Sequence, residues 1–433
     1  MNILYALIAL SFLILIHEVG HFLVARWTGV KVLEFAIFMG PKIYSWRKGE
    51  TEYSLRAIPM GGYVKMEGEE EYSNDERAFN KKPAGKKALI VFAGAATNII
   101  IAMIIITIIS LSAGYNTRTI AEMNEDSPLK AAGMQAGDEI VSFNNSHVFH
   151  PNDLALFLYV SDGEPVRISF RRPGIKGIQE VEVFPKKSEP VYLIGVVIGG
   201  SETQPESIIS RVEPRSPATQ AGLMPGDVII RVDDLEVSKR EDLYNYIQKN
   251  KDKPVTITVE RKGDPVTFES IVPMPSESYY DLGVQFEYRK DGFFGSVRSS
   301  LSYSASTIQS VIYTISWLFT GKASFKDISG PVGIVTYIGD VVEMGTGFKE
   351  KLFYLLQITA FLSLNLGVMN LLPFPALDGG KLILIAIEKI RGKAIAPEKE
   401  AWISMVGFFF LVALLIATLF NDIPRVVQRF FGG

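Results

Sequence analysis

The five residues from His17 to His21 read His-Glu-Val-Gly-His. On a helix, positions four apart lie on one face, so His17 and His21 could bind the same metal ion. The pattern is typical of zinc sites in which the intervening glutamate, here Glu18, acts as general base in peptide hydrolysis. Because the motif also occurs by chance in soluble proteins, its surroundings decide between a metal site and ordinary polar packing.

The motif lies within an apolar run, residues 3–25. As a helix, this run would be about 35 Å long, enough to cross a bilayer core of about 30 Å. Each ionised group near the bilayer centre costs about 2.5–3.5 kcal/mol. Ordinary packing does not need three ionisable side chains there, so a metal site is favoured. No basic segment precedes the run and no small-residue cleavage site follows it, which argues against a signal peptide.

A third zinc ligand must come from elsewhere, since catalytic zinc usually has three protein ligands. The protein has no cysteine, and its other histidines, His147 and His150, lie in a segment expected on the far side of the membrane. Asp378 follows a later apolar run, in a segment that two prolines and two glycines would unwind. Asp378 is therefore the predicted third ligand. The alternative is that it only caps the helix expected after it.

Three further apolar runs, residues 88–111, 352–372 and 402–420, predict a polytopic α-helical membrane protein with four spans. The charged fraction of 21% and the positive mean hydropathy of +0.20 exclude a simple soluble enzyme. Twelve Lys and Arg lie between residues 26 and 87, which predicts a cytoplasmic loop. Both termini and residues 112–290 would then lie outside. A net charge of −3 gives no support for a nucleic-acid partner.

The outer segment contains an internal repeat, because residues 127–140 recur as residues 216–229. Each copy predicts a short helix, a turn at Gly-Asp and a strand. The pattern resembles the PDZ domain of bacterial proteases, an α+β fold that binds peptides, including their carboxyl termini. We expect two tandem domains, residues 112–200 and 201–287. The alternative is a pair of spacer domains without a ligand.

Two more segments have a recognisable pattern. Residues 43–66 predict a cytoplasmic β-hairpin that turns at residues 48–50. Its edge could pair with an unwound substrate, or the hairpin could only stabilise the fold. Residues 288–350 are expected to form an amphipathic region at the membrane surface, with a helix at residues 293–319. A fifth span is the alternative for that helix. Residues 1–111 and 351–433 would carry the two pairs of spans.

Taken together, the motif at residues 17–21, the repeats and the pattern N-x-x-P-x-P-x-L-D-G at residues 370–379 resemble the site-2 protease family of intramembrane zinc metalloproteases. The resemblance extends over nearly the whole sequence, including residues 61–66 and 329–333. It implies His17, His21 and Asp378 as Zn²⁺ ligands and Glu18 as catalytic base. It also implies four residues that hold or receive the substrate: Asn365, Asn370, Pro373 and Pro375.

The second span departs from the family pattern in one respect. The family commonly has Gly-Pro before an asparagine there, whereas residues 93–98 read Ala-Gly-Ala-Ala-Thr-Asn. Asn98 is a candidate for stabilising the oxyanion, and its alternative role is an interhelical hydrogen bond, worth about 0.6 kcal/mol. The sequence does not choose among Asn98, Asn365 and Asn370 for the oxyanion.

The resemblance implies a zinc metalloendopeptidase of the bacterial inner membrane that makes the second cut of regulated intramembrane proteolysis. Its substrates would be single-span proteins such as pre-trimmed anti-sigma factors, and remnant signal peptides. The PDZ pair would exclude substrates with bulky outer domains. The alternative is an inactive membrane scaffold that recruits partners through its PDZ domains. A metal transporter would need more polar residues along several spans.

Overall fold

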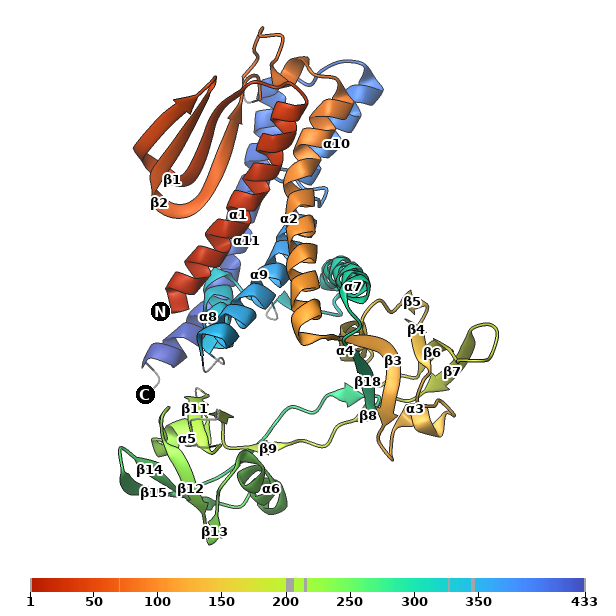
Figure 1. Ribbon diagram of the computed structural model, residues 1–433, viewed down its shortest axis with the longest axis vertical. Helices are drawn as coiled ribbons and strands as arrows, with labels where there is room; N and C mark the ends of the chain where they lie inside the picture. Colours follow the sequence, from red (N-terminus) through yellow and green to blue (C-terminus); the bar gives the residue numbers. More distant parts are fainter. Residues whose placement is uncertain are drawn as a thin grey trace.

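The computed structural model describes residues 2–69, 71–199, 206–213, 216–325, 328–343 and 347–431. These residues form a bundle of long helices, a sheet that lies along the first helix, and two sheet modules (Figure 1). The two modules lie at the end of the bundle where α1 begins and α11 ends.

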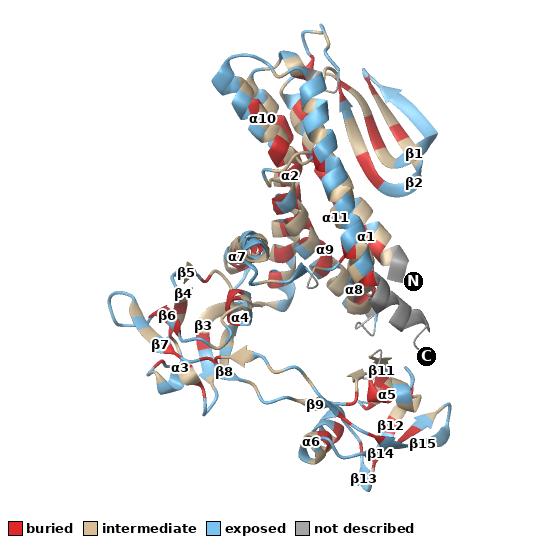
Figure 2. Cartoon of the chain, turned by 180° about the vertical axis from the view of Figure 1, so that it is seen from behind, coloured by how far each residue is buried: buried red, intermediate tan, exposed pale blue. Residues whose placement is uncertain are grey.

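Four helices are long and apolar enough to cross a membrane: α1 (Asn2–Trp27), α2 (Ala84–Ala113), α9 (Phe348–Asn370) and α11 (Pro397–Phe431). The four spans expected from the sequence are therefore present. The apolar window of α2 is 44% buried, whereas that of α11 is 11% buried. Thus α2 is a central helix and α11 lies at the edge of the bundle, where it is mostly exposed (Figure 2).

Small residues let the neighbouring helices approach α2 closely. A Cβ on Gly20 of α1 would lie 2.5 Å from the Ala93 carbonyl oxygen. A Cβ on Gly367 of α9 would lie 2.9 Å from the Ala95 carbonyl oxygen. Any larger residue at these positions would push the helices apart. The glycines thus bring α1 and α9 to the middle of α2.

The helix α7 (Phe293–Thr320) confirms the helix expected at residues 293–319, and it is not among the helices apolar enough to span a membrane. Its buried residues are mostly serine and threonine, such as Ser296 and Ser300, which face the bundle and the first module. Several of its large apolar residues, such as Phe294, Ile312 and Phe319, are exposed. This distribution suits a helix whose outer face contacts lipid.

Two shorter helices complete the helical part, α8 (Pro331–Glu343) and α10 (Asp378–Arg391). The start of α8 is fixed by the buried carboxylate of Asp422 in α11, which accepts hydrogen bonds from the backbone N–H groups of Gly330 (3.1 Å) and Gly333 (2.9 Å). This contact explains the glycines at residues 330 and 333.

The sheet beside α1 is built from β1 (Val32–Lys48) and β2 (Thr51–Met66), and the short helix η1 (Phe79–Lys81) follows it. The hairpin predicted within residues 43–66 is present, but the strands are longer. Both strands bend, so that Phe35 pairs with Tyr53 on one side and with Val64 on the other. Residues 62–66 therefore form one edge of the sheet, and residues 42–48 form the other.

The first sheet module has the strand order β18-β3-β4-β6-β7, with β5 beside β4. Its strands are β3 (Tyr115–Met123), β4 (Glu139–Phe143), β5 (Ser146–His147), β6 (Val166–Arg171), β7 (Gln179–Val183) and β18 (Val284–Arg289). Its helices are α3 (Pro128–Ala131) and α4 (Pro151–Tyr159). The module encloses its own apolar core (Figure 2).

The second sheet module repeats this order as β10-β11-β12-β14-β15, with β13 beside β12. Its strands are β10 (Val196–Gly199), β11 (Ile208–Val212), β12 (Val228–Val232), β13 (Leu235–Glu236), β14 (Val255–Arg261) and β15 (Asp264–Ile271). Its helices are α5 (Pro217–Ala221) and α6 (Arg240–Asn250). In both modules a serine caps the short helix, Ser127 before α3 and Ser216 before α5.

The modules do not simply follow one another, which corrects the expected boundaries of 112–200 and 201–287. The strand β18 completes the first module after the second has ended, while β10 belongs to the second module. Two short ladders connect them, β8 (Lys186–Lys187) with β17 (Tyr280–Asp281) and β9 (Tyr192–Leu193) with β16 (Met274–Pro275). The expected boundary at 200/201 lies outside the described residues. Local patterns did not reveal a strand supplied from so far along the sequence.

Candidate metal centre

The two histidines of the motif lie on one face of α1, as their spacing predicts. Their Nε2 atoms are 3.1 Å apart, and the rings are edge-on to each other at an interplanar angle of 84°. His21 contacts α2 through its Nδ1, which lies 2.9 Å from the Ile90 carbonyl oxygen. Because a carbonyl only accepts, Nδ1 carries the proton and Nε2 offers a lone pair.

Asp378 reaches the same point from the other side of the bundle. It is the first residue of α10, and its Oδ2 lies 3.1 Å from Nε2 of His17 and 3.4 Å from Nε2 of His21. The turn before it is tight, since a Cβ on Gly379 would lie 2.1 Å from the Leu372 carbonyl oxygen. The N-cap position of α10 is Leu377, which makes no side-chain capping hydrogen bond. The carboxylate of Asp378 is directed to the histidines.

These three atoms fit a zinc ion. Ligands about 2.0–2.1 Å from a tetrahedral zinc are about 3.3–3.4 Å apart, close to the separations of 3.1–3.4 Å found here. The buried Oδ2 of Asp378 accepts no hydrogen bond from the described residues. Lone pairs that converge without a proton between them repel one another unless a cation lies between them. The donor set of two imidazoles and a carboxylate is one that zinc prefers.

Gly94 of α2 makes room for the two imidazoles. A Cβ at this position would lie 2.4 Å from Nε2 of His21 and 2.8 Å from Cε1 of His17. The glycine is therefore required by the close approach of the two imidazoles. Sequence reasoning recorded the residue but assigned it no role, because a helical glycine shows no partner until the helices are assembled.

The asparagines predicted for substrate or oxyanion contact differ in their surroundings. Nδ2 of the Asn370 carboxamide lies 3.4 Å from Nδ1 of His17, so this side chain reaches the far edge of the imidazole ring. Asn98 is 0% exposed, and among the described residues neither atom of its carboxamide has a hydrogen-bond partner. Nδ2 of Asn365 donates to the Phe361 carbonyl within its own helix.

The remaining predicted residues are close to the clustered ones in the sequence. Pro373 and Pro375 line a small cavity of about 160 Å³ together with Gly380 and Lys381. Glu18 is half-buried beside the sheet, where its Cγ is 3.9 Å from the position of a Cβ on Gly62. The sheet thus reaches Glu18, the residue next to His17 in the sequence.

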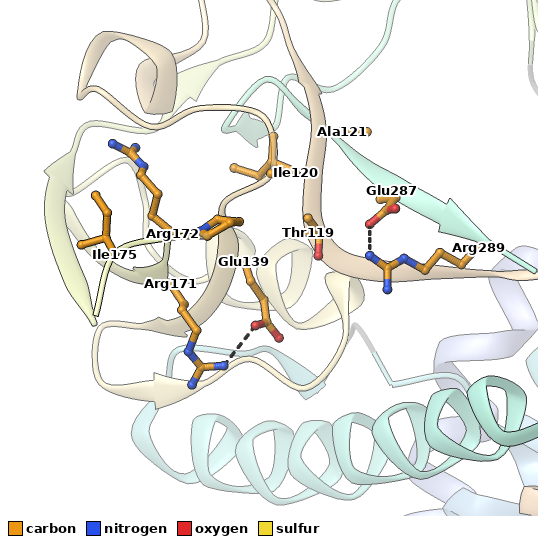
Figure 3. A pocket seen from close by; sticks show the side chains of 12 residues that line it. Thr119, Ile120, Ala121, Glu139, Arg171, Arg172, Ile175, Glu287 and Arg289 are labelled. Carbon is orange, nitrogen blue, oxygen red and sulfur yellow. Dashed lines mark hydrogen bonds and ion pairs between the residues drawn. The ribbon is translucent and has the colours of Figure 1, made fainter. Parts of the chain in front are cut away.

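His147 and His150 lie in the first sheet module and take no part in the centre. His150 caps α4 by accepting a hydrogen bond from the Asn152 N–H, and burial lowers its pKa. A cavity of about 660 Å³ also belongs to this module (Figure 3). Its three arginines are already paired, Arg171 with Glu139 and Arg289 with Glu287, as the dashed lines show, and Arg172 with Asp138. His17, His21 and Asp378 are not among the residues that line this cavity, so it is separate from their cluster.

Known proteins with similar sequences support the same chemistry. The model of peptidase family M50 matches residues 5–414. The protein is 32% identical over 431 residues to the zinc metalloprotease RasP of Oceanobacillus iheyensis, with 96% of each sequence covered. It is 30% identical over 434 residues to the regulator of sigma-W protease RasP of Bacillus subtilis, with 96% of each covered. It is also 30% identical over 449 residues to the regulator of sigma-E protease RseP of Escherichia coli, where the match covers 97% of this protein and 98% of the relative.

Proposed function

The chain belongs to peptidase family M50 and is a site-2 type metalloprotease, and we propose that it cuts the membrane spans of single-span proteins. The observation that carries the proposal is the convergence of His17, His21 and Asp378 within a bundle of four apolar helices. Ligands at this depth favour a substrate that is itself in the membrane. Zn²⁺ is the proposed metal, in keeping with the donor set and with the names of the relatives.

The reaction assigns a separate task to each residue. When bound, zinc would polarise the scissile carbonyl and lower the pKa of a water to about 7. Glu18 takes the proton from the attacking water and passes it to the leaving amine. His21 is held by the Ile90 carbonyl and His17 by Asn370, so the ligands stay fixed while the proton moves.

Asn98 is the best supported donor to the oxyanion. A buried carboxamide without a partner costs about 1–3 kcal/mol, which a protein tolerates where a ligand later supplies the partner. Asn98 lies one helical turn after Gly94, the residue that contacts both imidazoles. Asn370 instead orients His17, and Asn365 is engaged within α9.

A substrate helix must unwind before its carbonyls become accessible. The edge of the sheet at residues 62–66 supports this step, since it pairs only with residues 32–37 among the described strands. Its first residue, Gly62, is beside Glu18. An unwound substrate segment would add to this edge as a further strand. Pro373 and Pro375 would contact it from the other side.

The two sheet modules are proposed to be PDZ domains that act as a size filter. The first is attached firmly to α7, where Ser306 donates to the buried Asp153 and Ser146 lies 2.8 Å from the Tyr313 hydroxyl. The second contacts α8 through Arg211 and Asp340, 3.7 Å apart. Modules held against the bundle in this way would exclude a substrate that still carries a large outer domain.

The orientation follows from charge. The twelve Lys and Arg of residues 26–87 favour a cytoplasmic position for the sheet beside α1, so the modules and both termini would be outside the bacterial inner membrane. The names of two relatives refer to regulators of sigma factors. They support pre-trimmed anti-sigma factors as substrates, with remnant signal peptides as a second group.

The test is cleavage of a model single-span substrate in detergent by the wild type and by Glu18→Gln. We expect the variant to keep its metal and lose about 10²–10⁴-fold in rate, because only the proton carrier is removed. The same span fused to a folded outer domain should be cut slowly. Retained proteolysis in Glu18→Gln would refute the assignment, and an inactive wild type would favour the membrane scaffold.

A further inference from the structure

Lys381 forms an ion pair close to the metal centre that the proposed chemistry does not use. Its Nζ lies 2.7 Å from Oε1 of Glu69, and the two side chains are 34% and 17% exposed. Lys381 follows Asp378 by three residues, which is the next turn of α10. Glu69 follows β2, the strand that contains Gly62 beside Glu18. The pair thus joins the helix of the third ligand to the sheet beside the proposed base.

A second ion pair ties the other end of α10 to the bundle. Nζ of Lys87 in α2 lies 2.9 Å from Oε2 of Glu388, and both side chains are nearly buried. Oε1 of Glu388 also accepts a hydrogen bond from the Ile395 N–H at 2.8 Å. The two pairs line one cavity of about 490 Å³. Lys381 also lines the smaller cavity that includes Pro373 and Pro375.

Apolar packing holds α10 mainly through Ile385 and the partly buried Leu382, in its second and third turns. Its buried residues are Gly379, Gly380 and Ile385, and two of these have no side chain. Both glycines contact backbone carbonyls, so a small rotation of the helix would move the first turn. Removing one member of a partly buried ion pair leaves an uncompensated charge, which is destabilising. The orientation of α10 therefore depends on the two Lys–Glu contacts.

We propose that Lys381 and Glu69 are positioning residues that keep Asp378 within ligand distance of His17 and His21. Lys381 is one turn from Asp378 in α10, and Glu69 follows the sheet that contacts Glu18. The ion pair between Lys381 and Glu69 therefore fixes the position of Asp378 relative to Glu18. The proposal rests on the proposed metal centre. It extends the site to residues that do not touch the metal.

The experiment measures zinc affinity of the full-length protein in detergent by competition with a chelating dye. Lys381→Gln should lower the affinity about 10–100-fold, the usual effect of losing a residue that orients a metal ligand. Its Co²⁺-substituted form should show an altered ligand-field spectrum, and kcat should fall while KM changes little. Lys381→Arg should retain affinity. The exchange Lys381→Glu with Glu69→Lys should recover much of the loss.

A matched control is Arg77→Gln, which breaks an ion pair with Glu50 whose side chains are 50% and 55% exposed. It should leave zinc affinity unchanged. Melting temperatures identify variants that are merely unfolded, and Glu69→Gln provides a second way to break the pair. The proposal is overturned if folded Lys381→Gln and Glu69→Gln bind zinc as the wild type does, or if the exchanged pair binds no better than the weaker single variant. Failure of the proposed protease would appear separately, as an inactive wild type whose zinc affinity still depends on Lys381.

Discussion

Gly94→Ala is expected to disable the metal centre without unfolding the protein. The new Cβ would lie 2.4 Å from Nε2 of His21, whereas ordinary contacts begin at 3.4 Å, so the ring must move by about 1 Å. Metal sites tolerate deviations of only about 0.2 Å in ligand distance. His21 cannot retreat without losing its 2.9 Å contact with the Ile90 carbonyl oxygen. The two ligands that share this face should therefore no longer fit one ion.

The magnitude follows from this displacement. A misplacement of 1 Å costs about 10²-fold in rate, or about 2.7 kcal/mol of transition-state stabilisation. Zinc affinity should fall about 10–100-fold as the ligands separate. Alanine is intrinsically better than glycine in a helix by about 1 kcal/mol, so a general loss of helix stability does not explain the defect.

The assay compares zinc content and cleavage of a single-span substrate by wild type, Gly94→Ala and Gly85→Ala. Gly85 lies in the same helix, and a Cβ there meets no atom within 4 Å. Gly85→Ala should therefore behave as the wild type. Full zinc content and normal turnover in Gly94→Ala would refute the reasoning, because they would mean that the imidazoles are not confined by α2.

Three further predictions concern other parts of the molecule. Asp378→Ala should lower both zinc content and activity, measured on purified protein, whereas His147→Ala should change neither, because His147 is in the first sheet module. Burial raises the pKa of Asp227, but the hydrogen bonds from Arg261 and the Met224 N–H lower it more, so the net pKa is lowered. The ionised carboxylate therefore stabilises the fold at pH values above its ordinary pKa of 3.8, and this stability is lost as the pH falls through the lowered pKa. Thermal melting should show that the second module is sensitive to acid, and Asp227→Asn should reduce that sensitivity. Since the protein has no cysteine, Gly174→Cys in intact cells should react with a membrane-impermeant thiol reagent, whereas Lys81→Cys should not; the reverse result would invert the proposed orientation.

The sequence was sufficient for the features that depend on local pattern. The four apolar runs predicted the four spans, because length and apolar composition alone decide whether a helix can cross a bilayer. The spacing of His17 and His21 predicted their shared face. Asp378 was expected on the opposite side of the centre from ligand count and the family pattern, and its Oδ2 lies 3.1 Å from His17.

Features that arise from assembly could not be predicted in the same way. The contact between Gly94 and the imidazoles exists only where α1 and α2 cross, so it leaves no pattern in the sequence. The hydrogen-bond partner of His21 is the backbone carbonyl of Ile90, and because every residue has such a carbonyl, the sequence does not single it out. The burial of the serines in α7 reverses the usual amphipathic pattern, as we expect where the outer face of a helix meets lipid instead of water. The origin of β18 was missed because pairing between distant strands leaves no local signal.

The late arrival of β18 has a consequence for synthesis on the ribosome. Roughly 160 residues separate β3 from β18, so at about 5–20 residues per second the first module waits about 8–30 s for its last strand. All strands of the second module emerge within that interval. The second module is therefore able to fold first, while β3 remains an open edge available for wrong pairing. Substitutions that slow folding of the second module should lower the yield of intact protein more than their effect on its final stability would suggest.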